Sequence, residues 1–79
     1  MLRAEDVKIY IAQGLSCDYL EVNGDDGQHF EAIVVSKDFI GKNIVQQHQM
    51  VYKALGERMK DEIHALSMKT YTPDSWSKK

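Results

Sequence analysis

The chain has 79 residues, of which 43% are hydrophobic and 28% are charged, and its formal net charge at pH 7 is −2. These values are typical of one small globular domain, and no apolar run approaches the roughly 18 residues that a membrane-spanning helix needs. The one cysteine, Cys17, excludes an internal disulfide and a metal site made only of this chain's thiolates. We therefore expect a single domain over residues 1–79, without a secretory leader and in the cytoplasm.

The charge is unevenly distributed along the chain. Residues 1–36 carry two basic and seven acidic side chains, whereas residues 37–79 carry eight basic and five acidic ones. The second half is therefore weakly basic. Proteins that bind phosphate groups strongly concentrate far more positive charge than this, so the pattern is mainly typical of a solvated surface.

The first predicted element is a helix over residues 3–13. Val7 and Ile11 recur in it at helical spacing and define its apolar side. Gly14 follows directly, and a glycine after the last periodic residue predicts a helix end in the left-handed conformation. Cys17 lies in the connection that comes next, where we interpret it as a half-buried structural thiol.

Two strand-like segments follow, separated by a cluster of turn-forming residues. Residues 18–23 alternate in character, with Leu20 and Val22 on one face, and residues 29–36 are rich in β-branched side chains. The Asn-Gly-Asp-Asp-Gly sequence between them predicts a β-hairpin. We expect the second strand to be central in the sheet, with His29 where the hairpin loop meets it.

A long helix is predicted from residue 44 to about residue 60, with Asn43 as its N-cap. Gly56 lies inside this helix and should cost it about 1 kcal/mol relative to alanine. His48 lies on the apolar side, where we interpret it as a hydrogen-bonded packing residue. The residues that define this side are Ile44, His48, Val51, Tyr52, Leu55 and Met59.

The last strand is predicted over residues 64–71, because apolar and polar side chains alternate there. Thr72 followed by Pro73 is a helix-start signal, since threonine caps the first turn and proline fits its first position. We interpret Trp76, one turn later, as a lid over the core. One face of the strand carries His64, Leu66, Met68 and Thr70.

The order helix, strand, strand, helix, strand and short helix predicts an α+β fold with helices on one face of a three-stranded sheet. The hairpin makes the first two strands antiparallel. The crossover through the long helix should return the third strand parallel to the second and right-handed, so the sheet is expected to be mixed.

Residues spread along most of the chain together resemble the BolA family, within which the short chain is similar to compact IbaG-like and BolA-like members. The resemblance spans about residues 5–76 and implies a single domain similar to the class II KH fold. Two departures are that Gln47 stands where many members have arginine and that a Gly-x-x-Gly nucleotide-clamping loop is missing. The matching residues are His29-Phe30, Val34-Val35-Ser36, Phe39, Gly41, His48, Ile63-His64-Ala65, Thr72-Pro73 and Trp76.

The resemblance implies a non-enzymatic partner of a monothiol glutaredoxin, acting in iron-sulfur trafficking or iron regulation. The pair would share a 2Fe-2S cluster, with glutathione and the glutaredoxin cysteine supplying sulfur ligands. His64 matches the family's ligand in the carboxyl half, and His29 matches a variable Cys-or-His loop position. Imidazole can replace thiolate at the iron of such clusters. Alone, the chain is expected to be a monomer or weak homodimer.

A second interpretation is a nucleic-acid-binding regulator of transcription or the stress response, because the long helix and the turn before it resemble a helix-turn-helix. Nearby Asp38 and Glu57 dilute the positive charge, so binding would be weak and strongly salt-dependent. An enzyme is not expected, since the sequence shows no nucleophile beside a base and no phosphate-binding glycine loop. The candidate phosphate-contacting residues are Lys37, Lys42, Lys53, Arg58 and Lys60.

Overall fold

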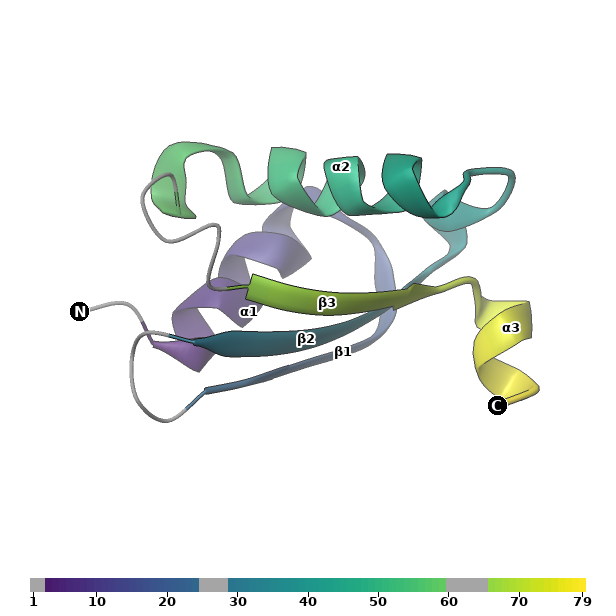
Figure 1. Cartoon of the computed structure of the whole chain (residues 1–79), viewed down its shortest axis with the longest axis horizontal. Helices are drawn as coiled ribbons and strands as arrows, with labels where there is room; N and C mark the ends of the chain where they lie inside the picture. Colours follow the sequence, from purple (N-terminus) through teal and green to yellow (C-terminus); the bar gives the residue numbers. More distant parts are fainter. Residues whose placement is uncertain (1–2, 25–28, 60–65) are drawn as a thin grey trace.

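A computed structural model describes residues 3–24, 29–59 and 66–79 of the chain. The helices and strands follow the predicted order (Figure 1). In the described part, no helix has both the length and the apolar character that crossing a membrane requires. The elements are α1 (Ala4–Gly14), β1 (Cys17–Asn23), β2 (Phe30–Ser36), the 3₁₀ turn η1 (Lys37–Phe39), α2 (Ile44–Leu55), the 3₁₀ turn η2 (Gly56–Met59), β3 (Leu66–Tyr71) and α3 (Pro73–Ser77).

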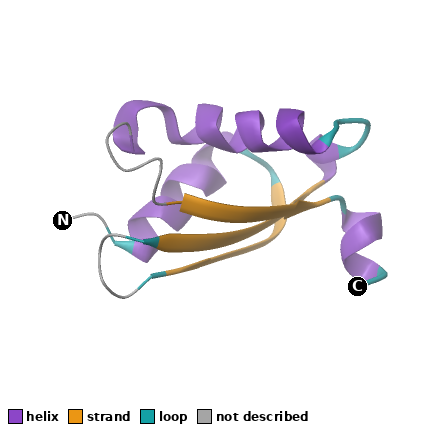
Figure 2. Cartoon of the chain, in the orientation of Figure 1, coloured by secondary structure: helices purple, strands orange, loops and turns teal. Residues whose placement is uncertain are grey.

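The three strands form one mixed sheet in the order β1-β2-β3. β1 pairs antiparallel with β2, and β2 pairs parallel with β3, so the predicted topology with a central β2 is confirmed. The α3 helix lies beyond the carboxyl end of β3, apart from α1 and α2 (Figure 2). The sheet therefore has one face covered by α1 and α2 and another that these helices leave open.

The hydrophobic core lies between the covered face of the sheet and the two long helices. Alternation along β2 directs every second residue into it, as the period of a strand requires. Each of these buried large side chains contributes about 1.5–3 kcal/mol relative to an exposed one. The buried cluster consists of Val7, Ile11, Phe30, Ala32, Val34, Phe39, Val51, Leu55 and Leu66.

Gly14 is the last residue of α1, but a glycine is required there for a different reason from the one predicted. The helix is capped by Leu15, whose φ is −137°, and Gly14 is not among the described glycines with positive φ. A Cβ atom on Gly14 would instead lie 2.5 Å from the Cβ atom of Ala54 in α2. The glycine is needed because the two helices approach closely at this point, not because the chain turns left-handed.

The α2 helix ends at Leu55, earlier than predicted, because Gly56 is a cap and not an internal residue. Gly56 has φ 60° and ψ −135°, a conformation that side-chain-bearing residues rarely adopt. Its N–H donates to the carbonyl of Tyr52, and the chain continues as η2. Asn43 caps the other end as predicted, since its side chain accepts from the N–H of Gln46.

The buried side of α2 also starts later than predicted. Ile44, the first residue of the helix, is 56% exposed, whereas Gln47 is buried. The Gln47 amide donates to the Lys42 carbonyl over 2.8 Å and accepts from the Thr70 hydroxyl over 2.6 Å. These bonds satisfy a buried polar group that the apolar pattern alone did not identify, and they join α2 to β3. The Met59 side chain, also predicted on this side, lies outside the described part.

Trp76 packs on the open face of the sheet and not over the core, so its predicted location is wrong. Its ring centroid lies 5.1 Å from that of Tyr19 and 5.1 Å from that of Tyr71. Both tyrosines pair in register with Val35, which is fully buried and alternates with the core residue Val34. The three rings therefore enclose Val35 in a second, smaller apolar cluster, and Thr72 holds α3 in place as the predicted N-cap.

Hydrogen bonds link three side chains of β1 on this open face. The Tyr19 hydroxyl donates to one carboxylate oxygen of Glu21 over 2.5 Å, and the Asn23 amide donates to the other over 2.7 Å. The hydrogen bond from Tyr19, and after it the one from Asn23, lowers the pKa of Glu21. The bond between Tyr19 and Glu21 also raises the pKa of Tyr19. Glu21 is therefore held as an ionised acceptor beside the aromatic cluster.

The close approach of α1 and α2 predicts that Gly14→Ala destabilises the fold by about 1–3 kcal/mol, as other overpacked positions do. Adding Ala54→Gly should restore part of this loss, because it removes the nearest atom that the new Cβ would meet. Urea unfolding followed by far-ultraviolet circular dichroism measures both free energies. A Gly14→Ala variant as stable as the native chain would show that the helices can move apart.

The Tyr19 hydrogen bond predicts that Tyr19→Phe raises the pKa of Glu21 toward the ordinary carboxyl value. Because the folded pKa is lowered, the carboxylate stabilises the fold above its unfolded pKa, and this contribution disappears as pH falls through the folded pKa. Side-chain carboxyl NMR titration of Glu21 measures the change. Tyr52→Phe, which removes a hydroxyl on α2, is the control, and an equal shift in that variant would exclude the Tyr19 bond as the cause.

Candidate functional site

The amino ends of β2 and β3 lie side by side because the two strands are parallel. Phe30, the first residue of β2, pairs in register with Leu66, the first residue of β3. His29 immediately precedes Phe30 and is exposed to solvent. An imidazole thus stands at this end of the sheet, where it is accessible to a partner molecule.

The second predicted ligand, His64, lies outside the described residues, as do Ile63, Ala65 and Lys60. What the structure describes is the strand to which this segment is attached. Leu66, the first described residue of that strand, pairs with Phe30, so the structure places His29 but not His64 at this end of the sheet.

Cys17, the first residue of β1, is half-buried and carries a free thiol. Burial raises the pKa of this thiol, and the nearby carboxylates of Asp38 and Asp18 raise it further. The thiol is therefore protonated at neutral pH, whereas metal ligation and nucleophilic attack need the thiolate. This environment agrees with the interpretation of Cys17 as a structural residue.

No three His, Cys, Asp or Glu side chains gather closely enough to hold a metal ion within residues 3–24, 29–59 and 66–79. His48 does not join His29, since it lies on α2 and is partly buried. Its Nε2 atom is buried and has no hydrogen-bond partner among the described residues, which differs from the predicted hydrogen-bonded role. The neighbouring Gln47 makes the polar contacts to Lys42 and Thr70 instead.

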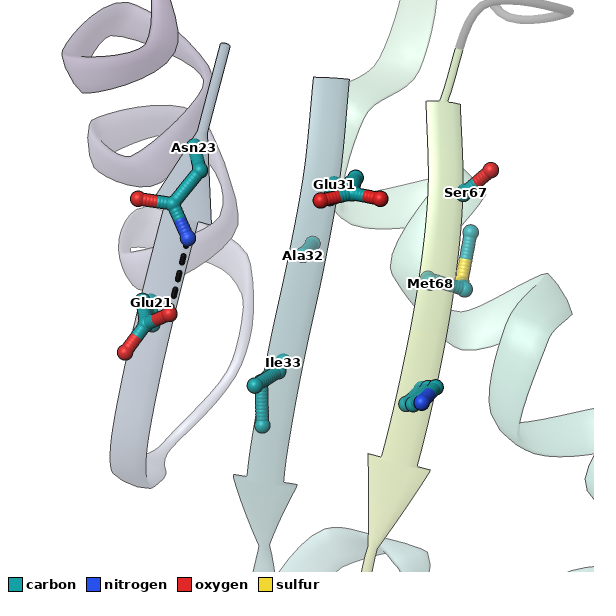
Figure 3. A pocket seen from close by; sticks show the side chains of 8 residues that line it. Glu21, Asn23, Glu31, Ala32, Ile33, Ser67 and Met68 are labelled. Carbon is teal, nitrogen blue, oxygen red and sulfur yellow. Dashed lines mark hydrogen bonds between the residues drawn. The ribbon is translucent and has the colours of Figure 1, made fainter.

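The open face of the sheet contains a depression of about 220 Å³ that the sequence did not single out (Figure 3). Its walls are two rows of side chains that strand register brings together from β1, β2 and β3. The row nearest His29 is Asn23-Glu31-Ser67, and all three side chains are polar. The next row is Glu21-Ile33-Lys69, in which Ile33 lies between a carboxylate and an ammonium group.

The sequence held one signal for this surface, namely the polar residues that alternate with core residues along each strand. That signal assigns Glu21 to the face opposite Leu20, but it does not say which residues of other strands lie beside it. The neighbours Ile33 and Lys69 depend on register, which is a long-range property of the sheet. The depression could therefore be located only from the structure.

The candidate phosphate-contacting residues do not form one continuous surface. Lys42 and Lys53 line the same groove of about 200 Å³ on the outer side of α2. Arg58 instead lies with its guanidinium carbon 4.6 Å from the ring centroid of Tyr10, and it donates to Gln13 of α1. Lys37 is exposed at the start of η1. The structure thus brings together two of the four described candidates.

Comparison with known proteins finds relatives that match nearly the whole chain. A family model described as BolA-like protein matches residues 5–75. The chain is 44% identical over 80 residues to "Protein BOLA2" of Arabidopsis thaliana, covering 96% of this chain and 85% of that protein. It is 38% identical over 74 residues to "Acid stress protein IbaG" of Escherichia coli K12, covering 92% and 87% respectively.

A further relative is named "DNA-binding transcriptional regulator BolA" of Haemophilus influenzae, with 39% identity over 54 residues, or 68% of this chain and 52% of that protein. The fold is similar to the structure of a BolA homologue from Coxiella burnetii, with a TM-score of 0.84 and 45% identity. That likeness covers 98% of this chain and 99% of the other. The chain therefore belongs to the BolA-like protein family.

Proposed function

We propose that this protein is a non-enzymatic partner of a monothiol glutaredoxin and that the two share a 2Fe-2S cluster, in iron-sulfur trafficking or iron regulation. The observation that carries the proposal is the pairing of Phe30 with Leu66. His29 directly precedes Phe30, and in the sequence His64 comes two positions before Leu66, which supports a partner that docks at this end of the sheet. Membership of the BolA-like family supports the same role.

The donor groups of this chain suit a shared cluster better than one held by this chain alone. Cys17 is half-buried and its pKa is raised, so the chain is poorly equipped to supply thiolate. His29 offers an exposed imidazole, and nitrogen ligation by histidine is established chemistry for 2Fe-2S centres. In this proposal, His29 and His64 supply nitrogen ligands, while the glutaredoxin cysteine and glutathione supply sulfur. When bound, the cluster supplies iron and sulfide for transfer or a signal of iron status.

The proposal predicts a new visible spectrum when this protein is added anaerobically to a cluster-loaded monothiol glutaredoxin. Absorbance and circular dichroism should change and saturate at one protein per glutaredoxin. His64→Ala should alter or abolish the new spectrum, and His29→Ala should alter it, because each substitution removes a nitrogen ligand. His48→Gln is the matched control, since it removes the remaining histidine and should leave the spectrum unchanged.

Far-ultraviolet circular dichroism must show that each variant is folded before its spectrum is interpreted. An unchanged glutaredoxin spectrum with folded native protein would reject the shared cluster. A new spectrum that was identical for the native chain and both ligand variants would retain the partnership but reject histidine ligation.

Nucleic-acid binding is the second candidate function, and the groove lined by Lys42 and Lys53 favours it. Its phosphate contacts are limited, because Arg58 packs on Tyr10 and donates to Gln13. The affinity for duplex DNA should therefore be weak, and because phosphate contacts carry it, it should fall as salt rises and depend little on sequence. Fluorescence anisotropy with labelled duplexes at several salt concentrations measures this dependence, and tight, sequence-selective binding at physiological salt would raise this candidate above the first.

A further inference from the structure

The depression of about 220 Å³ on the open face of the sheet, which we call the open-face depression, carries opposite charges on its two sides. Glu21 lies on β1 and Lys69 on β3, and both pair in register with Ile33 of the central strand. Neighbouring strands lie about 4.8 Å apart, so roughly 9.6 Å separates the backbones of Glu21 and Lys69. The depression therefore has a carboxylate on one side, an ammonium group on the other and an aliphatic side chain between them (Figure 3).

The carboxylate of Glu21 is ionised and held in a fixed position. It accepts from the Tyr19 hydroxyl over 2.5 Å and from the Asn23 amide over 2.7 Å. The hydrogen bonds from Tyr19 and then Asn23 lower its pKa, with a smaller contribution from Lys8, whereas Lys69 is not among the groups that shift it. An ionised carboxylate has about four acceptor positions, so Glu21 can still accept from a ligand. That ligand meets a charge that is already oriented.

The other polar side chains of the depression have hydrogen-bonding groups that the chain does not use. Glu31, Ser67 and Lys69 are exposed, and their side chains make no hydrogen bond or ion pair with another described residue. Ser67 and Lys69 lie on the same face of β3, whereas the carboxylates of Glu21 and Glu31 come from β1 and β2. Donor groups are therefore gathered on one side of the depression and negative charge on the other.

Ile33 supplies the apolar part of the depression. It is half-buried, whereas Val35, the next β2 residue on this face, is fully buried beneath Trp76. Covering Ile33 with an aliphatic group would remove apolar surface from water, which favours binding. The row of Tyr19 and Tyr71 follows directly, so the aromatic cluster limits how far a ligand can extend toward the carboxyl end of β2.

We propose that the open-face depression binds a small zwitterion of the α-amino-acid class that has an aliphatic side chain. Its ammonium group would bind Glu21, its carboxylate would bind Lys69, and its side chain would cover Ile33. The distance across two strands leaves room for such a unit and for one hydrogen bond of about 2.8 Å at each end. Drug-sized ligands occupy about 300–1,000 Å³, so the smaller depression suits a single amino acid. The inference does not depend on the histidines or on the proposed cluster.

Other occupants fit this arrangement less well. A metal ion finds no group of three His, Cys, Asp or Glu side chains in the part of the chain that the structure describes. Phosphate groups would meet the carboxylates of Glu21 and Glu31. A second copy placed with Ile33 on a two-fold axis would bring Glu31 against Glu31 if the axis ran along β2, and Glu21 against Glu21 if it ran across the strands.

Titration of leucine into ¹⁵N-labelled protein near neutral pH tests the proposal by amide NMR. The signals of residues 21, 33 and 69 and of their neighbours should shift, with a dissociation constant in the millimolar range, as expected for so small a ligand on an open site. N-acetyl-leucine lacks the ammonium group and leucine amide lacks the carboxylate, so each should bind about threefold more weakly or worse. Glycine, which lacks the aliphatic side chain, should also bind more weakly than leucine.

Substitutions test the same contacts from the side of the protein. Glu21→Gln and Lys69→Gln should each weaken leucine binding by about threefold or more. Lys69→Glu should weaken leucine binding further and strengthen binding of leucine amide, whose only charge is positive. Glu57→Gln and Lys53→Gln are the matched controls, because these exposed residues lie in η2 and α2, in the helical layer, and both variants should bind leucine like the native chain.

Far-ultraviolet circular dichroism checks that each variant is folded, and Lys69→Gln, which changes an exposed side chain, keeps the test valid if Glu21→Gln is not. No shifts with leucine well above millimolar concentration, or shifts centred outside the depression, would overturn the proposal. Leucine amide that bound as tightly as leucine would show a site for cations only, and equally tight N-acetyl-leucine would show that the ammonium group is not recognised. Either result would overturn it, as would equal losses in the control variants.

Discussion

The parallel pairing of β2 with β3 is the constraint on which the other features of this structure depend. A parallel neighbour can be reached only by a crossover, and α2 supplies it by running back across one face of the sheet. The Gln47–Thr70 hydrogen bond fastens that helix to β3, and the missing side chain at Gly14 lets α1 approach it. The same pairing brings the two strand starts together beside His29 and the two strand ends together beneath Trp76.

The two faces of the sheet are stabilised in different ways. Val34 packs into the main core under the long helices, whereas its neighbour Val35 is fully buried on the other side without help from either helix. Trp76 accounts for this burial, because its contacts with Tyr19 and Tyr71 span the row to which Val35 belongs. The short α3 helix thus closes one end of the open face and leaves the depression at the other end accessible.

Local signals in the sequence were enough to predict the elements, but not the roles that depend on distant neighbours. Alternation in the strands and the caps at Asn43 and Thr72 act within a few residues, so the topology and both helix starts could be predicted. Gly14 could not be interpreted correctly, since its role depends on Ala54, 40 positions along the chain. The candidate site shows the same limit, because His29 could be assigned to a strand start whereas the row around Ile33 required the register.

The length of β2 separates the end of the sheet that carries His29 from the turn that leads into α2. Seven residues of strand span roughly 23 Å, so His29 and this turn lie near opposite ends of β2. One end carries an exposed histidine, and the other leads to the groove that Lys42 and Lys53 line. A partner that contacts only the first end leaves the second accessible, whereas a partner that contacts both must extend along the whole strand. The proposed cluster partner and a ligand of the groove would therefore not compete for the same residues.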